Sequence, residues 1–290
     1  MIGGSIIIQV LVWGIILGCI YALAASGFSL IFGVTKVVNL AHGELIMIGG
    51  YVSFWLAVLT GLNPYLFIPL AVAVSSVISI VFYSLGFHKI MGAEKLREAF
   101  LAIGFTYVIE NMAVLMWKED TRVVPSPYRQ QFIVVGGFNL GVDQLITIAG
   151  TAIVLLAFFF FIMKTKWGKM ARAVSQNREA AMMIGVNVVR IDMLTFAVSG
   201  AMAGVGGALL GVILYLNPYM GLGLTIMAFT IVVFGGMGSI LGAVVGAIIL
   251  GIAQQYAVFF LGGEWSYAVA FALLILILVL RPQGLFGGGG

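Results

Sequence analysis

The sequence predicts an all-α fold, a polytopic transmembrane helix bundle with eight full spans plus one half or re-entrant segment. Of the 290 residues, 62% are hydrophobic and only 8% are charged, and the mean hydropathy is +1.19. Soluble domains carry about a quarter charged residues. The apolar residues form blocks of about 18 or more, long enough to cross a hydrocarbon core of roughly 30 Å. In that core the chain must satisfy its own backbone hydrogen bonds, so these blocks are expected to be helices.

The spans follow one another along the whole chain. The clear ones are 6–34, 38–60, 65–87, 99–117, 146–163, 191–214 and 265–280. The region 222–260 is too long for one crossing and is interrupted by Gly235-Gly-Met-Gly-Ser239. We therefore expect a half-length segment, 222–234, and a full span, 238–260. Small residues four apart, Gly200/Gly204, Gly207/Gly211 and Gly238/Gly242/Gly246, predict closely packed helices.

Lysine and arginine near the spans predict the orientation, because cytoplasmic loops of membrane proteins are enriched in these residues. The loop 164–190 is the most basic, with Lys164, Lys166, Lys169, Arg172, Arg178 and Arg190. This loop is expected to be cytoplasmic. Counting spans from it places the N-terminus outside and the C-terminus in the cytoplasm. The N-terminal residues 1–5 lack the features of a cleaved secretory signal, so the first block is expected to remain as a helix.

Polar residues interrupt the apolar pattern between the first two blocks. Asn39, His42 and Glu44 follow Lys36 there without a conventional turn. Asn39 is a plausible helix N-cap, and Glu44 would lie in the first turn, where its charge suits the helix dipole. Two interpretations remain open: a capped polar segment leading into the second span, or a broken helix that lines a solute path.

The basic loop is predicted to contain a short helix. In Ser175-Gln-Asn-Arg-Glu-Ala-Ala-Met-Met-Ile-Gly185, Asn177 is a good N-cap, Glu179 falls in the first turn, and Gly185 suits the position after the helix. The predicted helix, 178–184, has an apolar side with Ala180, Ala181 and Ile184. Two turns are not stable alone, so it must dock, either on its own bundle or in a groove of a cytoplasmic partner.

Glu110 is a carboxylate inside the span 99–117, and such residues usually face the bundle interior. We favour a structural hydrogen-bonding role over a solute or proton site. No catalytic residue and no metal-ligand set is predicted, since His42 and His88 are far apart and Cys19 is the only cysteine. No phosphate-binding Gly-x-x-x-x-Gly-Lys-Ser/Thr loop occurs, so the chain is not expected to bind ATP by that route.

These segments resemble a known family. The run Gly27-Phe-Ser-Leu-Ile-Phe-Gly-Val-Thr-Lys-Val-Val-Asn-Leu-Ala-His-Gly-Glu-Leu45, followed by Ile48-Gly-Gly-Tyr51, looks like the signature of branched-chain amino acid ABC importer permeases, in particular the smaller, H-type subunit. Glu179-Ala-Ala-x-x-x-Gly185 resembles the importer coupling motif, and Leu280-Arg-Pro-Gln-Gly-Leu285 also matches the family. The chain lacks the Ile-x-Leu-Pro that follows the coupling motif in many importers.

The resemblance implies a larger complex in a bacterial inner membrane. Residues 1–286 would form one permease domain, followed by a glycine tail, 287–290. It would pair with a second permease subunit, two cytoplasmic ATPases that bind the ATP, and an extracytoplasmic substrate-binding protein. The ATPase-coupling residues would be Arg178, Glu179, Ala180, Ala181 and Gly185, and the substrate-pathway residues Asn39, His42, Glu44 and Glu110. The family transports leucine, isoleucine and valine, and close relatives transport urea, amides or other amino acids.

Two other function classes remain open from the residues alone. An ion-coupled secondary transporter or channel would use Glu110 as an ion or proton site and would need no ATPase. A membrane-embedded enzyme has little support, because no nucleophile or metal cluster is present in the sequence. Purification with or without an ATPase partner separates the first alternative from an importer subunit.

Overall fold

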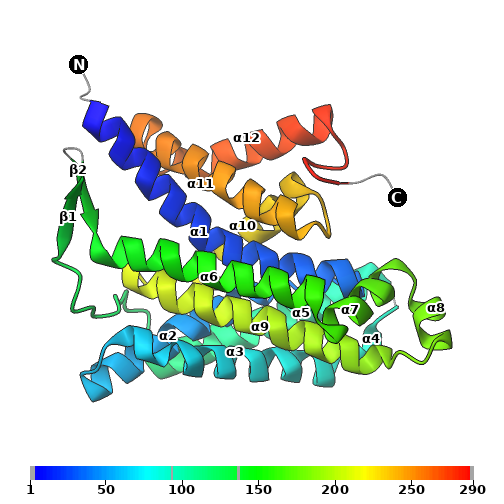
Figure 1. Cartoon of the computed structure of the whole chain (residues 1–290). Helices are drawn as coiled ribbons and strands as arrows, with labels where there is room; N and C mark the ends of the chain where they lie inside the picture. Colours follow the sequence, from blue (N-terminus) through cyan, green and yellow to red (C-terminus); the bar gives the residue numbers. More distant parts are fainter. Residues whose placement is uncertain (1–3, 93, 136–137, 288–290) are drawn as a thin grey trace.

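The apolar blocks form helices that run in both directions through an elongated bundle, as the computed structural model of residues 4–92, 94–135 and 138–287 shows (Figure 1). The first half contains α1 (Gly4–Thr35), α2 (His42–Thr60), the 3-10 turn η1 (Pro64–Phe67), α3 (Ile68–Phe82), the π-helical turn η2 (Tyr83–Phe87), α4 (His88–Ile90) and α5 (Lys95–Trp117). The second half contains β1 (Phe132–Val135), β2 (Phe138–Gly141), α6 (Val142–Lys164), α7 (Lys166–Gln176), α8 (Arg178–Met183), α9 (Val188–Ile213), α10 (Met220–Gly235), α11 (Ile240–Leu261) and α12 (Trp265–Leu280).

The helices confirm a polytopic membrane bundle, with a span count that differs from the prediction. Among the described residues, seven helical segments are long and apolar enough to cross a membrane, and α10 and α12 are shorter apolar helices. The predicted full span 265–280 is therefore not confirmed as one, because the 16 residues of α12 extend only about 24 Å. The predicted break after residue 234 is confirmed: α10 ends at Gly235 and α11 starts at Ile240.

Three local features differ from the sequence expectation. The second span begins at His42, because residues 36–41 are not helical. The span expected from residue 99 begins earlier, at Lys95. The loop between α5 and α6 contains an antiparallel pair, β1 and β2, with Ile133 opposite Leu140. No strand was expected there. Each strand has only four residues, too few for an alternating pattern to identify it in the sequence.

The centre of the bundle is α9, which packs along α1, α2 and α3, while α1 also lies along α11. Small residues make these contacts close. A β-carbon at Gly204 would come within 2.6 Å of the Ala71 carbonyl oxygen on α3, so the predicted close packing at Gly200/Gly204 is confirmed. The predicted run Gly238/Gly242/Gly246 is wrong at its first member, since Gly238 lies in the turn before α11 with a φ of +86°.

The bundle has two distinct ends. In Figure 1 the β1–β2 hairpin lies at one end, and α7 and α8 lie at the opposite end, to the right. The C-terminal segment folds back on α10 through hydrogen bonds from the Leu285 and Phe286 amides to the Phe234 and Gly235 carbonyls. Of the predicted glycine tail, Gly287 lies against Gly236, and residues 288–290 are outside the described part.

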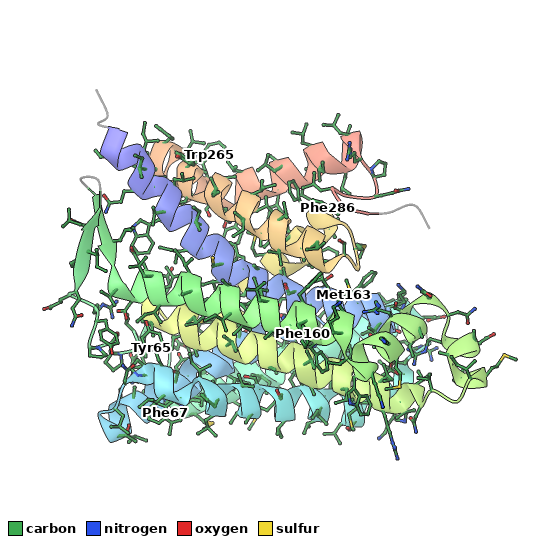
Figure 2. The ribbon with its side chains drawn as sticks, viewed as in Figure 1. Tyr65, Phe67, Phe160, Met163, Trp265 and Phe286 are labelled. Atoms are coloured by element: carbon green, nitrogen blue, oxygen red, sulfur yellow. The ribbon has the colours of Figure 1, made fainter. Side chains whose placement is uncertain are left out.

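Large apolar side chains cover the outside of the bundle. Phe160 on α6 is 63% exposed and Trp265 on α12 is 53% exposed, and Figure 2 shows their positions on the ribbon. In water such a surface would be unfavourable, whereas in a bilayer it faces hydrocarbon. The exposed apolar surface and the buried small residues together agree with a helix bundle that is embedded in lipid.

Candidate functional site

Residues 36–41 enter the bundle as irregular backbone. His42, the first residue of α2, contacts the Ala24 carbonyl of α1 through Nε2 at 2.9 Å. Ala24 lies about 11 residues before the end of α1, which corresponds to about 16 Å along the helix. On the other side, the Thr106 hydroxyl of α5 donates to the Leu40 carbonyl at 3.3 Å, again about 16 Å from the near end of its helix. The start of α2 therefore lies deep between α1 and α5.

The depth of residues 36–41 distinguishes the capped segment at the surface from the broken helix. A capped segment at the surface would place His42 near the end of α1, which the Ala24 contact excludes. Irregular backbone inside a bundle is tolerated when its polar groups are satisfied by neighbouring protein. Here the Lys95 ammonium donates to the Lys36 carbonyl at 3.0 Å, and Thr106 serves Leu40. The depth thus agrees with a broken helix.

His42 is held by two contacts in a fully buried position. Its Nε2 atom faces a carbonyl, which can only accept, so Nε2 carries the hydrogen. Nδ1 then accepts from the Ser199 hydroxyl of α9 at 3.3 Å. The edge of Phe28 packs on the imidazole, with ring centroids 5.8 Å apart. The imidazole therefore connects α1, α2 and α9.

Glu44 is the most unusual side chain of the group. It is fully buried, and among the described residues neither carboxylate oxygen has a hydrogen-bond partner. The carboxylate lies against the first turn of α10 at Gly221, where a β-carbon would overlap it. Next to it, the Gly43 amide donates to the Thr225 hydroxyl at 2.7 Å. The absence of side chains at Gly43 and Gly221 lets α2 and α10 approach this closely and makes room for the carboxylate.

Asn39, His42 and Glu44 lie on one buried segment, and Glu110 on α5 is close enough for its charge to act on the Glu44 carboxyl group. The expectation that Asn39 is the N-cap of the second span is wrong: the N-cap is Ala41, and Asn39 instead accepts from the Ala41 amide at 3.1 Å. Glu44 lies in the first helical turn, as predicted. Glu110 is half-buried, and no hydrogen bond or ion pair of its carboxylate is found in the described ranges.

The short helix of the basic loop is confirmed as α8, with its predicted start at Arg178. Asn177 is the N-cap and accepts from the Ala180 amide at 2.9 Å. Gly185 has a φ of +84°, and the Gly185 and Val186 amides donate back to the Met182 and Ala181 carbonyls at 3.0 Å each. These two backbone hydrogen bonds form a Schellman motif. The helix ends one residue earlier than predicted, at Met183, because Ile184 is already its C-cap.

One side of α8 is bound to its own bundle. Ala181 is 2% exposed and belongs to an apolar cluster with Val174 and Ile191. The Arg178 guanidinium binds the carboxylate of Asp192 on α9 through Nη1 at 3.2 Å and Nη2 at 2.6 Å. This ion pair was not predicted from the sequence. No spacing rule links residues 14 apart on different helices.

The other side of α8 is open. Met183 is 88% exposed and Ile184 is 77% exposed, and Glu179, Ala180 and Gly185 are also exposed. We name the segment Met182–Ile184 the α8 tip. The predicted apolar side is thus divided, since Ala181 faces the bundle and Ile184 faces away. Two adjacent apolar side chains this exposed, on a rigidly anchored turn, are typical of a contact surface.

No metal site emerges in the part of the chain that the structure describes, where no three His, Cys, Asp or Glu side chains gather.

Comparison with known proteins gives a consistent result. The protein family described as branched-chain amino acid transport system / permease component matches residues 9–278. The chain is 33% identical over 287 residues to the high-affinity branched-chain amino acid transport system permease protein LivH of Salmonella typhimurium, covering 94% of this chain and 93% of that protein. It is 25% identical over 295 residues to the permease protein LivM of the same organism, covering 92% and 67%.

A solved structure has a similar fold. PsaBC from Streptococcus pneumoniae in complex with Fab superposes with a TM-score of 0.52 at 11% identity, covering 93% of this chain and 91% of that one. At this identity the likeness concerns the fold alone.

Proposed function

Because the chain belongs to the family of branched-chain amino acid transport system permease components, we propose that it forms the translocation path of an ABC importer for leucine, isoleucine and valine. In this proposal it is a non-catalytic membrane subunit that pairs with a second permease subunit. Two cytoplasmic ATPases drive the pair, and an extracytoplasmic binding protein delivers the substrate. A relative at 25% identity is LivM, a permease of a system that also has LivH, which supports a pair of unlike subunits.

The observation that carries the coupling role is the division of α8. Its inner side is fastened by Ala181 and by the Arg178–Asp192 pair, while the α8 tip is exposed. A helix that is anchored on one side and apolar on the other can transmit a displacement from a bound partner to α9 without unfolding. In this proposal Arg178 and Ala181 hold the helix to its bundle, and Glu179, Ala180 and the tip face the ATPase. Gly185 ends the helix so that the tip protrudes.

The outer surface of α5 supports a second permease subunit beside it. Asn111 is exposed and Glu110 is half-exposed on this helix. The helix α5 makes few contacts with α2, η2 and α10. Charged and amide groups are costly against lipid, so they favour a protein or water-filled neighbour. We therefore place the solute path between α5 and the second subunit, with the buried group of Asn39, His42 and Glu44 behind it.

The proposed orientation puts the α7–α8 end in the cytoplasm. Then α1 begins outside, and the C-terminal segment after α12 lies inside. Lys166, Lys169 and Arg190 are exposed at the α7–α8 end, which agrees with the enrichment of basic residues on the cytoplasmic side.

Reconstitution with defined subunits tests the proposal. Proteoliposomes are prepared with this chain, the second permease, the ATPases and the binding protein. They are expected to take up leucine only when ATP is present on the side of the membrane where the ATPases lie. Met183→Asp with Ile184→Asp should lower uptake about tenfold or more, because two charges cannot bury in an apolar groove. Met183→Leu is the matched control and should transport normally. Uptake by the chain without any ATPase would contradict the importer assignment.

A further inference from the structure

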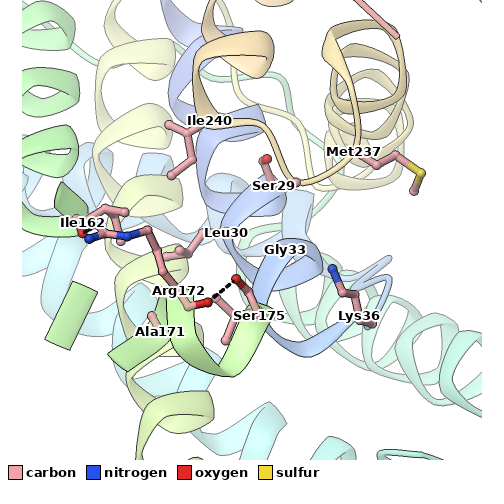
Figure 3. A pocket seen from close by; sticks show the side chains of 12 residues that line it. Ser29, Leu30, Gly33, Lys36, Ile162, Ala171, Arg172, Ser175, Met237 and Ile240 are labelled. Atoms are coloured by element: carbon pink, nitrogen blue, oxygen red, sulfur yellow. Dashed lines mark hydrogen bonds between the residues drawn. The ribbon is translucent and has the colours of Figure 1, made fainter. Parts of the chain in front are cut away.

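A pocket of about 200 Å³ opens near the end of α1, between α1, α6, α7 and the turn before α11 (Figure 3). It is outside the group formed by Asn39, His42 and Glu44. The polar residues of its lining are Ser29, Lys36, Arg172 and Ser175, and Gly33 and Gly238 leave its wall without side chains. Figure 3 shows Lys36 on one side and Arg172 on the other, with Ser29 and Gly33 between them and the Arg172 guanidinium turned toward Ile162.

The two cations of the lining have no carboxylate partner among the described residues. The ion pairs found there involve Lys95, Arg97, Arg122 and Arg178 instead. Arg172 uses only its Nη1 atom, toward the Ile162 carbonyl and the Met163 sulfur, in the hydrogen bonds of the described part. The Lys36 ammonium lies over the Phe32 ring at 5.9 Å, with no hydrogen bond recorded from it in the same part of the chain. Both groups retain donors for a ligand.

A buried hydroxyl adds a third donor. Ser29 is 1% exposed, and its Oγ atom has no hydrogen-bond partner in the described residues. A buried hydroxyl without a partner is uncommon, because its desolvation is not repaid. The lining thus combines two positive charges with an unused hydroxyl and contains no carboxylate.

The backbone at Lys36 is held in an unusual conformation. Its φ is +59°, in the left-handed region that non-glycine residues rarely adopt. The Lys95 ammonium, which also pairs with Glu98, donates to the Lys36 carbonyl at 3.0 Å and so fixes this turn. Such strained positions are concentrated at functional sites.

From these observations we propose that this pocket binds a phosphoryl group, from an anionic phospholipid or from a soluble phosphate compound. The chemistry needed is a tetrahedral oxyanion that accepts from Lys36 and Ser29, with the positive charge of Arg172 in the wall of the pocket. The pocket lies where a membrane-spanning helix ends, at the level expected for lipid headgroups, and a bound anion would connect α1 to α7, the helix that precedes α8. The inference goes beyond the proposed transport function and does not depend on the substrate.

The lipid source is tested on the full-length protein in nanodiscs that contain phosphatidylglycerol and phosphatidylcholine. Mass spectrometry of the intact protein, released from the nanodiscs into detergent, would count the phosphatidylglycerol molecules that remain bound. Lys36→Gln with Ser29→Ala is expected to weaken retention about fivefold or more, the effect of about one basic contact. Lys169→Gln is the control, because Lys169 is an exposed cation on the same α7 and does not line the pocket.

The soluble source is tested with inorganic phosphate at constant ionic strength. A soluble phosphate ligand is supported when phosphate raises the melting temperature above its value in chloride for the wild type and for Lys169→Gln. The Lys36→Gln, Ser29→Ala double variant should then show no such rise. Selective phosphatidylglycerol retention without this phosphate effect supports a lipid headgroup. The proposal is overturned when neither ligand distinguishes the double variant from Lys169→Gln, with all three proteins showing the same helical circular dichroism and elution volume.

Discussion

The guanidinium of Arg178 and the carboxylate of Asp192 form a two-point hydrogen-bonded ion pair that joins α8 to α9. The Asp192 side chain is 2% exposed and the Arg178 side chain 36% exposed. The pair is therefore shielded on the carboxylate side and open on the guanidinium side. It fixes α8, whose apolar tip faces away from the bundle.

Removal of Arg178 should release α8. Arg178→Ala leaves a buried carboxylate unpaired, so we expect a loss of about 3 kcal/mol in the stability of the α8–α9 contact. Hydrogen exchange of the amides in 178–186 would measure this as a faster exchange confined to that segment. The Arg178→Ala, Asp192→Ala double variant should recover part of the loss, because no unpaired charge remains. Equal exchange in all three proteins would show that the pair does not hold the helix.

The Gly185 position should tolerate Asn better than Ala. A β-carbon there meets nothing within 4 Å, so any cost comes from the φ of +84° alone. We expect Gly185→Ala to destabilise the end of α8 by about 1 kcal/mol, and Gly185→Asn by less, since Asn visits this region more readily. Exchange of the Val186 amide, which closes the Schellman motif, reports the difference. Identical effects of Ala and Asn would argue against a conformational cause.

The contact of α2 with α10 should be intolerant of a methyl group. A β-carbon at Gly43 would overlap the Gly221 carbonyl oxygen, so Gly43→Ala must separate the two helices and is expected to cost about 1–3 kcal/mol. Gly104→Ala is the matched control, because the space around Gly104 on α5 is open. It should be neutral or slightly stabilising, as Ala favours the helix over Gly. Thermal unfolding in detergent measures both, and a lower melting temperature for Gly104→Ala alone would contradict the packing argument.

Gly221 and Glu44 should be coupled through their shared space. Gly221→Ala alone would press a methyl group into the Glu44 carboxylate and lower the melting temperature. With Glu44→Ala in the same chain, the carboxylate is gone and the methyl group has room, so the double variant should be more stable than Gly221→Ala. A double-mutant cycle gives the coupling free energy, expected at about 1 kcal/mol or more. Additive effects would show that the two groups do not compete for the same volume.

The sequence was sufficient for the features that depend on neighbouring residues in the chain. The helical blocks, the break after Gly235 and both ends of α8 follow from apolar content, N-cap chemistry and the left-handed freedom of Gly185. The ends of α8 involve residues about one helical turn apart, and the helical blocks depend on composition over about 18 consecutive residues. Asn39 is the exception: its side chain bonds to a nearby amide, but the choice of Ala41 as the N-cap depended on how the segment enters the bundle.

Packing decided the remainder, because the residues in contact are far apart in the sequence. Gly43 and Thr225 bond across 182 positions, and His42 reaches Ser199 across 157. The depth of residues 36–41, the buried Glu44 carboxylate beside Gly221 and the pairing of Arg178 with Asp192 all result from which helices lie side by side. Composition and spacing specify that a segment is helical and apolar. Only the fit of one helix surface against another specifies which polar groups are enclosed together.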